Sequence, residues 1–238
     1  KKCSLEHNLT AMKLAVENNM PSIIQLVIGM PGETPETINE TIEFCKSIVT
    51  LSPNCNPNDT SVNYAQALPG TPLYEYGRYK GLIGRNLNGE EAYLLRISDK
   101  DAHDEISTLN FTDYPTLECQ TWRPRITIET NYAYVKQFGL EHYRTILLRD
   151  ARFFQPENSD AGYFANPRRL LDATMATDTI NDIKTAHATK DGNDPLPSLW
   201  SLLKSRNFGL AVVCYPVFFY RLRAFLPVMI MLRGLTQR

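Results

Sequence analysis

Residues 23–48 read IIQLVIGMPGETPETINETIEFCKSI, and this stretch decides the fold. The run 23–28 is apolar at nearly every position, which is typical of a strand in a parallel sheet covered by helices. After the turn, Thr34 is a good N-cap and Pro35 suits the first position of a helix. The stretch therefore predicts a buried strand that turns directly into a helix. Apolar residues recur along one face of that helix: Ile38, Ile42, Cys45, Ile48 and Val49.

A second strand and turn repeat this pattern about forty residues later. Residues 61–67, SVNYAQA, predict a strand, and the LPGTP turn at 68–72 leads into a short helix that ends near Gly81. A helix capped by Ser4 precedes the first strand, so helices and strands alternate in the rhythm of a parallel sheet or barrel. Because two strands are too few for such a sheet and the chain does not start with Met, we expect a portion of a longer protein.

Three regions are expected along the chain. Residues 1–85 hold the βα units, residues 86–190 form a mainly helical extension with an amphipathic helix after Pro124, and residues 191–238 form a linker and a tail. The net charge of −1 gives no general attraction to nucleic acid. The segment Pro195–Arg238, however, contains no Asp or Glu and carries a charge of +6, which leaves −7 on the remaining residues. A basic tail thus follows a mildly acidic body.

The tail is rich in apolar and aromatic residues. Residues 208–220 are almost continuously apolar, and Arg221 and Arg223 separate them from a second apolar run that ends at Leu232. A membrane-spanning helix needs about 20 apolar residues, and two arginines near its centre argue against a simple span. Two alternatives are equally supported: the tail lies in the membrane interface, or it packs as a helical hairpin on the protein or on a partner.

Residues with obvious metal or catalytic chemistry are scarce. The five cysteines show no tight ligand spacing, which indicates reduced cytosolic thiols, and a core role is expected for Cys45. The four histidines show no metal-binding spacing either. Neither turn matches the glycine-rich phosphate loops. The sequence predicts no metal site within this chain and identifies no catalytic residue.

Both turns follow strands of one parallel sheet, so they are expected at its carboxyl end, where ligands of α/β folds bind. The turn glycines let the backbone approach a ligand closely, and the helix N-termini offer N–H groups. From the residues alone, a stiff corner is at least as well supported as a binding site. Glu33 is the one carboxylate at this edge, and it either binds a ligand amine or helps to cap its helix.

The segments VIGMPGETPETINETIEFCKSI (27–48) and YAQALPGTPLYEYGRYKGLI (64–83) closely resemble the later part of radical S-adenosylmethionine enzymes. The nearest subgroup carries an N-terminal cobalamin-binding domain. Its members have a G-x-P-G-E-T turn after the fifth barrel strand and a P-G-T-x-L-[YF] turn after the sixth. The resemblance covers roughly residues 1–85 and implies an α/β fold: the C-terminal portion of a partial (β/α)6 barrel, followed by a mainly helical extension.

The resemblance also implies a chemistry. S-adenosylmethionine would bind on a four-iron four-sulfur cluster, and the radical formed from it would abstract hydrogen from the substrate; with cobalamin as a further cofactor, the substrate would be methylated, cyclised or rearranged. Residues at both strand ends would contact S-adenosylmethionine, with Ile28 and Gly29 on the adenine side. The implied cofactor-binding set is Ile28, Gly29, Pro31, Gly32, Glu33, Gln66, Leu68, Pro69 and Gly70.

This sequence departs from the family pattern in one decisive respect. It has no Cys-x-x-x-Cys-x-x-Cys cluster loop, so the cluster ligands are expected in a missing N-terminal half on the same or another chain, and this chain alone is expected to be inactive. The alternative function is a non-catalytic binding or scaffold module whose tail docks on a membrane or a partner. For the enzyme, a basic apolar tail suits a lipid-like or porphyrin-like substrate. The expected location is the cytoplasm, with or without attachment to a membrane surface.

Overall fold

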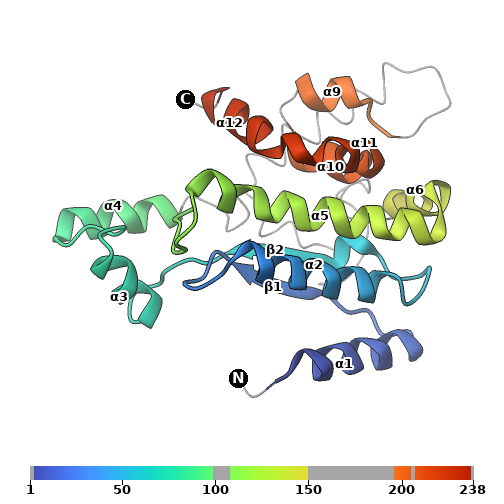
Figure 1. The fold of residues 1–238 in the computed structure, drawn as a ribbon, viewed down its shortest axis with the longest axis horizontal. Helices are drawn as coiled ribbons and strands as arrows, with labels where there is room; N and C mark the ends of the chain where they lie inside the picture. The colour runs from blue at the N-terminus through green and yellow to red at the C-terminus, as the bar shows by residue number, and fades with distance from the viewer. Residues whose placement is uncertain (1–2, 99–107, 150–195, 205–206, 237–238) are drawn as a thin grey trace, which may run out of the picture. The chain divides into compact units, whose positions relative to one another are not determined.

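The computed structural model describes residues 3–98, 108–149, 196–204 and 207–236. They form a mainly helical α/β fold with one small sheet (Figure 1). The parts of the expected helical extension and linker at 99–107 and 150–195 lie outside the described residues. The elements are α1 Leu5–Glu17, β1 Ile24–Ile28, α2 Pro35–Val49, η1 Pro57–Asp59, β2 Thr60–Tyr64, α3 Pro72–Tyr79, α4 Leu87–Ser98, α5 Thr116–Phe138, α6 Leu140–Arg149, α9 Leu199–Lys204, α10 Phe208–Cys214, α11 Pro216–Leu222, η3 Arg223–Phe225 and α12 Leu226–Thr236.

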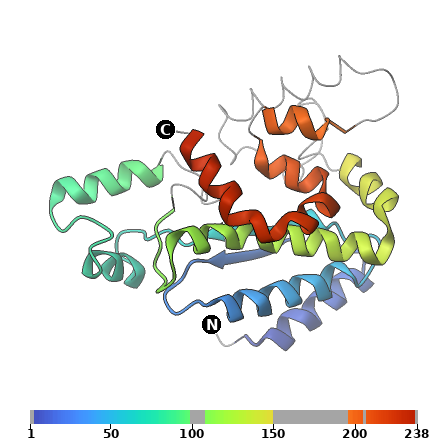
Figure 2. The same ribbon diagram turned by 45° about the horizontal axis from the view of Figure 1, so that its top comes forward.

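The predicted alternation of helices and strands in the first eighty residues is confirmed. β1 and β2 are neighbours in a parallel two-stranded sheet, and they lie side by side in Figures 1 and 2. The Ala65 N–H donates to the Ile28 carbonyl at 2.8 Å, which fixes the register where β1 ends. α1 begins at its predicted cap, where the Ser4 hydroxyl accepts from the His7 N–H at 3.2 Å.

The chain divides into two compact units that are discontinuous in sequence. The first unit contains Lys1–Ile23, Ile42–Thr60 and Thr127–Arg223. The second unit contains Ile24–Thr41, Ser61–Ile126 and Ala224–Arg238. The predicted boundaries near residues 85 and 190 stay a prediction. Both Pro-Gly turns fall within the second unit.

β1 is less buried than its composition predicts. Ile28 is buried, but Val27 is 58% exposed and Ile23 is 47% exposed, so one face of the strand is uncovered by the described residues. The expectation of a strand covered on both faces is therefore wrong for these residues. A run of apolar residues does not reveal which of them will face a neighbour, because that depends on elements elsewhere in the fold.

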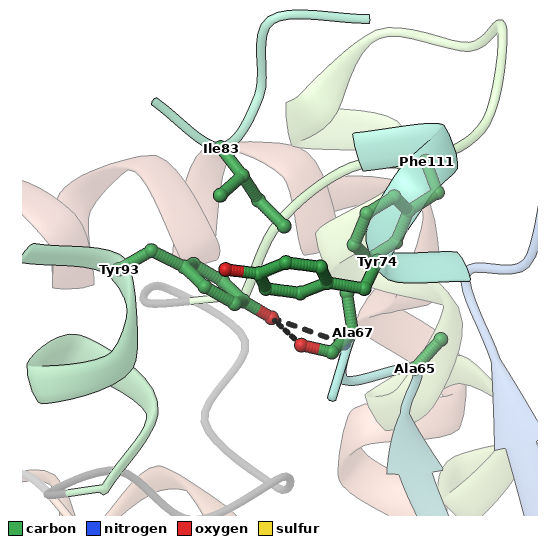
Figure 3. Close-up of a cluster of buried hydrophobic side chains, with 6 residues drawn as sticks. All are labelled: Ala65, Ala67, Tyr74, Ile83, Tyr93 and Phe111. Atoms are coloured by element: carbon green, nitrogen blue, oxygen red, sulfur yellow. Dashed lines mark hydrogen bonds between the residues drawn. The ribbon is translucent and has the colours of Figure 1, made fainter. Parts of the chain in front are cut away.

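The second predicted strand ends three residues early. β2 stops at Tyr64, because β1 ends at Ile28 and offers no further backbone partner beyond Ala65. Instead, the Tyr93 hydroxyl donates to the Ala67 carbonyl at 2.8 Å and accepts from the Ala67 N–H at 3.0 Å (Figure 3). One side chain thus satisfies both backbone groups that a neighbouring strand would have satisfied.

The residues after β2 pack in a small buried cluster of the second unit. Figure 3 shows the Tyr74 and Tyr93 rings next to each other, with centroids 6.1 Å apart. The Tyr74 hydroxyl donates to a Glu90 carboxylate oxygen at 3.2 Å, and this carboxylate also pairs with the Arg78 side chain at 3.0 Å. These contacts join α3 to α4. The buried members of the cluster are Ala65, Ala67, Tyr74, Ile83, Tyr93 and Phe111.

The opposite edge of β2 meets a side chain of α5. The Arg123 side chain donates to the Val62 carbonyl at 3.0 Å, and Val62 lies an odd number of residues from Ala65, so its carbonyl points away from β1. Among the described residues the sheet has two strands and no barrel is formed. What is established is therefore the coarser α/β arrangement.

α5 begins at Thr116 and passes straight through Pro124. The expected helix start after Pro124 is therefore wrong. A proline inside a helix removes the N–H that would bond the carbonyl four residues earlier, which here belongs to Gln120. The Tyr64 hydroxyl lies 3.0 Å from the Gln120 carbonyl and 3.3 Å from the Cys119 carbonyl, and it replaces the missing donor. Tyr64 is itself buried, so this bond is shielded from water.

In the first unit, α5 holds the tail through charge and ring contacts. Glu129 is mostly buried and pairs with Lys46 of α2 at 3.0 Å and with Arg223 at 3.1 Å. The rings of Tyr132 and Tyr220 stack with centroids 3.5 Å apart. From α6, the buried Tyr143 hydroxyl donates to the Val213 carbonyl at 2.6 Å. α10 is accordingly buried in the protein at Leu210, Ala211, Val212, Val213 and Cys214.

We predict that Tyr64→Phe destabilises the protein because it leaves the Gln120 carbonyl without a donor. An unsatisfied buried acceptor costs about 1–3 kcal/mol, so the free energy of unfolding should fall by that amount. Pro124→Ala restores an N–H facing the Gln120 carbonyl. In the Pro124→Ala background, Tyr64→Phe should therefore cost less, with a coupling of at least about 0.5 kcal/mol in a double-mutant cycle.

The matched control for this cycle is Tyr93→Phe, which also removes a buried hydroxyl but whose bonds go to Ala67. Tyr93→Phe and Pro124→Ala should be additive. Urea unfolding followed by circular dichroism measures all four combinations of each pair. Additivity of Tyr64→Phe with Pro124→Ala would contradict the assignment of the Tyr64 hydroxyl to the Gln120 carbonyl.

Candidate functional site

The two Pro-Gly turns have the same backbone geometry. In the first, the Glu33 N–H donates to the Met30 carbonyl at 3.2 Å, and in the second the Thr71 N–H donates to the Leu68 carbonyl at 3.1 Å. The central glycines, Gly32 and Gly70, have φ of +83° and +81°. Proline followed by a glycine at positive φ is the pattern of a type II turn. The similar sequences at 30–33 and 68–71 therefore form the same local structure.

Each turn feeds a capped helix, as predicted. The Thr37 N–H donates to the Thr34 hydroxyl at 3.3 Å, and the Thr34 N–H donates to the Thr37 hydroxyl at 3.0 Å. In the second turn the Thr71 hydroxyl accepts from the Tyr74 N–H at 3.3 Å. Pro35 and Pro72 open the two helices. These caps use part of the N–H groups that a ligand would otherwise find at the helix N-termini.

Glu33 braces its own turn. One of its carboxylate oxygens accepts from the Met30 N–H at 3.2 Å and from the Gly29 N–H. Its helix is capped by Thr34 instead, so capping, one of the two roles considered for Glu33, is wrong. The carboxylate oxygen bonded in this way ties the end of β1 to the turn. Binding of a ligand amine by Glu33 stays a prediction.

The Glu33 carboxyl group is perturbed by its surroundings. Partial burial raises its pKa above the ordinary value of 4.5, and the bonds from Gly29 and Met30 only partly oppose this effect. Glu36, on the exposed first turn of α2, shows the opposite: bonds from Thr34 and from its own backbone lower its pKa. The two neighbouring carboxylates therefore respond to pH with opposite signs.

Two buried side chains, Tyr64 and Cys119, lie beside Gly29 at the start of the first turn. A side-chain carbon added at Gly29 would come within 3.6 Å of the Tyr64 ring and 3.9 Å of the Cys119 sulfur. Burial raises the pKa of Cys119 to about 11, and the Glu33 carboxylate contributes to the increase. Cys119 is thus a neutral packing residue at physiological pH, as Cys45 is, whose pKa burial raises to about 12. The expected core role of Cys45 is confirmed.

The predicted cofactor-binding residues fall into two groups: an exposed rim at the two turns and a buried or half-buried base beside the strand ends. Ile28 and Gly29 are buried, and Glu33 and Gln66 are half-buried. The remaining five are exposed: Pro31, Gly32, Leu68, Pro69 and Gly70. Added side-chain carbons at Gly32 and Gly70 would meet no atom within 4 Å, so the backbone of both turns is open to approach.

The two turns lie at the same edge of the sheet but not at the same height. One residue, Gly29, separates β1 from the first turn, whereas Ala65, Gln66 and Ala67 separate β2 from the second turn. The second turn therefore begins two residues further from its strand, and two residues of chain span at most about 7 Å. A ligand that touches both turns has to accommodate this offset, which strand prediction over 61–67 concealed.

Metal ligation receives no support from the described residues. Within 3–98, 108–149, 196–204 and 207–236, no group of three or more His, Cys, Asp or Glu side chains could hold a metal ion. His142 has a structural partner, since its Nε2 lies 2.8 Å from the Pro53 carbonyl. The Tyr134 hydroxyl donates to the same carbonyl.

Three side chains important for this edge were not identified from sequence. Tyr64, Tyr93 and Cys119 surround the strand ends, yet each appears as an ordinary apolar or aromatic position in its element. The one local signal was Pro124, which within a helix implies an unpaired carbonyl and therefore a donor elsewhere. The identity of that donor depends on tertiary contact across 56 residues.

Comparisons of this sequence with protein-family models and with curated proteins gave no match, and no solved structure matched the fold. The chemistry of the turns therefore has to be argued from their geometry and tested directly.

We predict that Glu33→Gln removes a pH dependence of stability. Because the folded-state pKa of Glu33 is raised, its contribution is fully present below about pH 4.5 and is lost as pH rises through the folded-state pKa. The free energy of unfolding of Glu33→Gln relative to the unmodified protein should therefore increase over this window and stay level above it. Denaturant unfolding at a series of pH values from about 2 to about 8 measures this difference and covers the window of the control variant below.

Glu36→Gln is the matched control with the opposite sign. The lowered pKa of Glu36 gives a contribution that is present above about pH 4.5 and lost as pH falls through the folded-state pKa. Relative to the unmodified protein, Glu36→Gln should lose stability as pH rises toward about 4.5, whereas Glu33→Gln should gain stability as pH rises above this value. Parallel curves for Glu33→Gln and Glu36→Gln would show that burial does not control the Glu33 carboxyl group.

Proposed function

We propose that this chain is the C-terminal portion of a radical S-adenosylmethionine enzyme, and that its two Pro-Gly turns form one wall of the S-adenosylmethionine pocket. The observation that carries the proposal is the repeated type II turn at the ends of two adjacent parallel strands. Ligands of parallel α/β folds bind at this edge. In this proposal, the two strands are the fifth and sixth of a partial barrel whose other strands lie elsewhere.

The contacts proposed for this chain are mainly with its backbone. The open backbone at Gly32 and Gly70 suits the close approach of a flat adenine or ribose group. Leu68, which is 52% exposed beside the second turn, supplies an apolar surface for the adenine ring. Glu33 is assigned to bracing the turn, since its carboxylate holds the Gly29 and Met30 N–H groups.

The described residues do not fit a four-iron four-sulfur cluster, because they contain no group of metal-ligating side chains. The proposal therefore assigns the cluster ligands to another segment or chain, and no catalytic step is assigned to the residues described. A cluster bound there would supply the electron for cleavage of S-adenosylmethionine. The present chain would shape the pocket and exclude water from it. Cobalamin, in the same proposal, belongs to a separate domain.

A second candidate function is a non-catalytic binding or scaffold module that docks on a membrane or a partner through its tail and not through the turns. It is favoured by the internal bonding of the first turn, since Glu33 and Thr34 satisfy N–H groups that a binding loop would leave for its ligand. In that case the turns are stiff corners. The two candidates differ in whether the exposed glycines matter for a ligand or for stability alone.

Release of 5′-deoxyadenosine tests the proposed reaction. The full-length protein that carries this chain would be reconstituted with iron and sulfide, reduced, and supplied with S-adenosylmethionine. We expect 5′-deoxyadenosine, measured by liquid chromatography, together with an iron content of four per chain. An intact cluster without 5′-deoxyadenosine release would contradict the enzymatic function.

Glycine variants test the pocket separately from the reaction. Gly32→Ala and Gly70→Ala should each weaken S-adenosylmethionine binding by about tenfold or more, because the added methyl and the strain at positive φ move the turn backbone. Gly81→Ala is the matched control: Gly81 also has positive φ and open space around it, but it lies at the end of α3. Equilibrium dialysis with labelled S-adenosylmethionine measures the affinity of the full-length protein.

All three variants should lose similar stability, about 1–2 kcal/mol, since each forces alanine into a left-handed conformation. Thermal unfolding checks this equivalence. Equal affinities for the three variants would favour the stiff-corner alternative, in which the turns do not touch S-adenosylmethionine.

A further inference from the structure

The outer side of α12 is an exposed apolar surface. Along this helix Leu226 and Ile230 are buried, which accounts for one side of it. The other side carries Val228, Met231 and Leu232, which are 48–54% exposed, and Phe225 of η3, directly before the helix, is 57% exposed. These four residues are called the α12 outer face below. A surface helix normally places polar residues on the side that faces water.

The α12 outer face belongs to a tail with a strongly biased charge. No Asp or Glu occurs from Pro195 to Arg238, while six basic residues do. Of these, Lys204, Arg221 and Arg223 are exposed. Arg221 precedes Phe225 by four residues, so chain connectivity alone keeps their backbones within about 14 Å. An apolar surface with cations close to it and no anions in its segment matches an anionic lipid interface.

α10 and Arg223, which also belong to the tail, are excluded from this role by their contacts. α10 has the most continuous apolar sequence, but five of its residues are buried and Tyr143 holds its Val213 carbonyl. Arg223 is engaged with Glu129 and lies over the Tyr220 ring at 3.9 Å. Among the described helices none is long and apolar enough by itself to span a membrane; one bent pair, Phe208–Cys214 with Pro216–Gly234, would be long enough.

We propose that the α12 outer face docks into the interface of an anionic membrane, with α12 lying in the membrane plane and Arg221 near the lipid phosphates. The inference rests on burial and charge and is independent of the proposed enzymatic function. A second copy of this chain is the competing occupant. It is disfavoured because apposed outer faces would bring two acid-free segments of charge +6 together.

Vesicle co-sedimentation of the full chain tests the proposal. We expect pelleting with vesicles of phosphatidylcholine and phosphatidylglycerol at 70:30, and much weaker pelleting with pure phosphatidylcholine. The triple variant Val228→Gln, Met231→Gln, Leu232→Gln should lower the affinity by at least about tenfold, since interfacial binding scales with buried apolar area. Arg221→Gln should lower it by about fivefold at 0.1 M salt and have little effect at 1 M salt.

The matched control replaces three apolar side chains outside the tail that are at least as exposed: Leu5→Gln, Leu14→Gln and Leu87→Gln. This control should pellet like the unmodified protein. Circular dichroism checks that both triple variants are folded. Equal pelleting of the two triple variants, or no preference for anionic vesicles, would overturn the proposal, as would a dimer in size-exclusion chromatography that the α12 triple variant dissolves.

A tryptophan placed in the α12 outer face reports insertion directly. The chain has two tryptophans, of which Trp122 is buried and Trp200 is 77% exposed. Phe225→Trp in the Trp200→Phe background leaves Trp122 as a constant contribution. We expect a blue shift of its emission with anionic vesicles. An unshifted emission while the protein pellets would show that another surface makes the contact.

Discussion

The bond between the Tyr64 hydroxyl and the Gln120 carbonyl connects the sheet to the part of α5 that belongs to the second unit. Pro124 leaves that carbonyl without its helical N–H, and burial makes an unpaired carbonyl costly. Tyr64 can supply the donor because it stands at the last position of β2 with its ring beside Gly29. The unpaired carbonyl in α5, the end of β2 and the first turn all contact the Tyr64 side chain, so a change at any of them affects the others.

In the candidate site, too, side chains of this protein form hydrogen bonds with backbone groups that have no partner in a helix or a sheet. Glu33 accepts from the backbone just after β1, Tyr93 bonds to the backbone after β2, and Arg123 donates to the outer edge of β2. These side-chain hydrogen bonds take the place of bonds to neighbouring strands, so the two-stranded sheet has partners for its backbone groups without further strands. They also determine what remains for a ligand, namely the exposed rim of the two turns and not their buried base.

The tail combines two contrasting surfaces in one short segment. α10 and the stacked Tyr220 are held by α5 and α6, whereas the outer side of α12 has no covering among the described residues. Composition does not distinguish the apolar run at 208–220 from the one that ends at Leu232, because both lie in the segment without Asp or Glu. Only burial distinguishes the part of the tail that belongs to the protein core from the part that is exposed.

The sequence by itself determined the local structure: the helix over 35–49, the caps at Thr34 and Thr71, and the two Pro-Gly turns, because these depend on backbone preferences and on neighbours within four residues. The tertiary structure decided where β2 ends, that α5 continues through Pro124, and which faces of β1 and α12 are exposed. Each of these depends on a donor, an acceptor or a covering element distant in the sequence, and no periodicity or propensity carries information about such a partner.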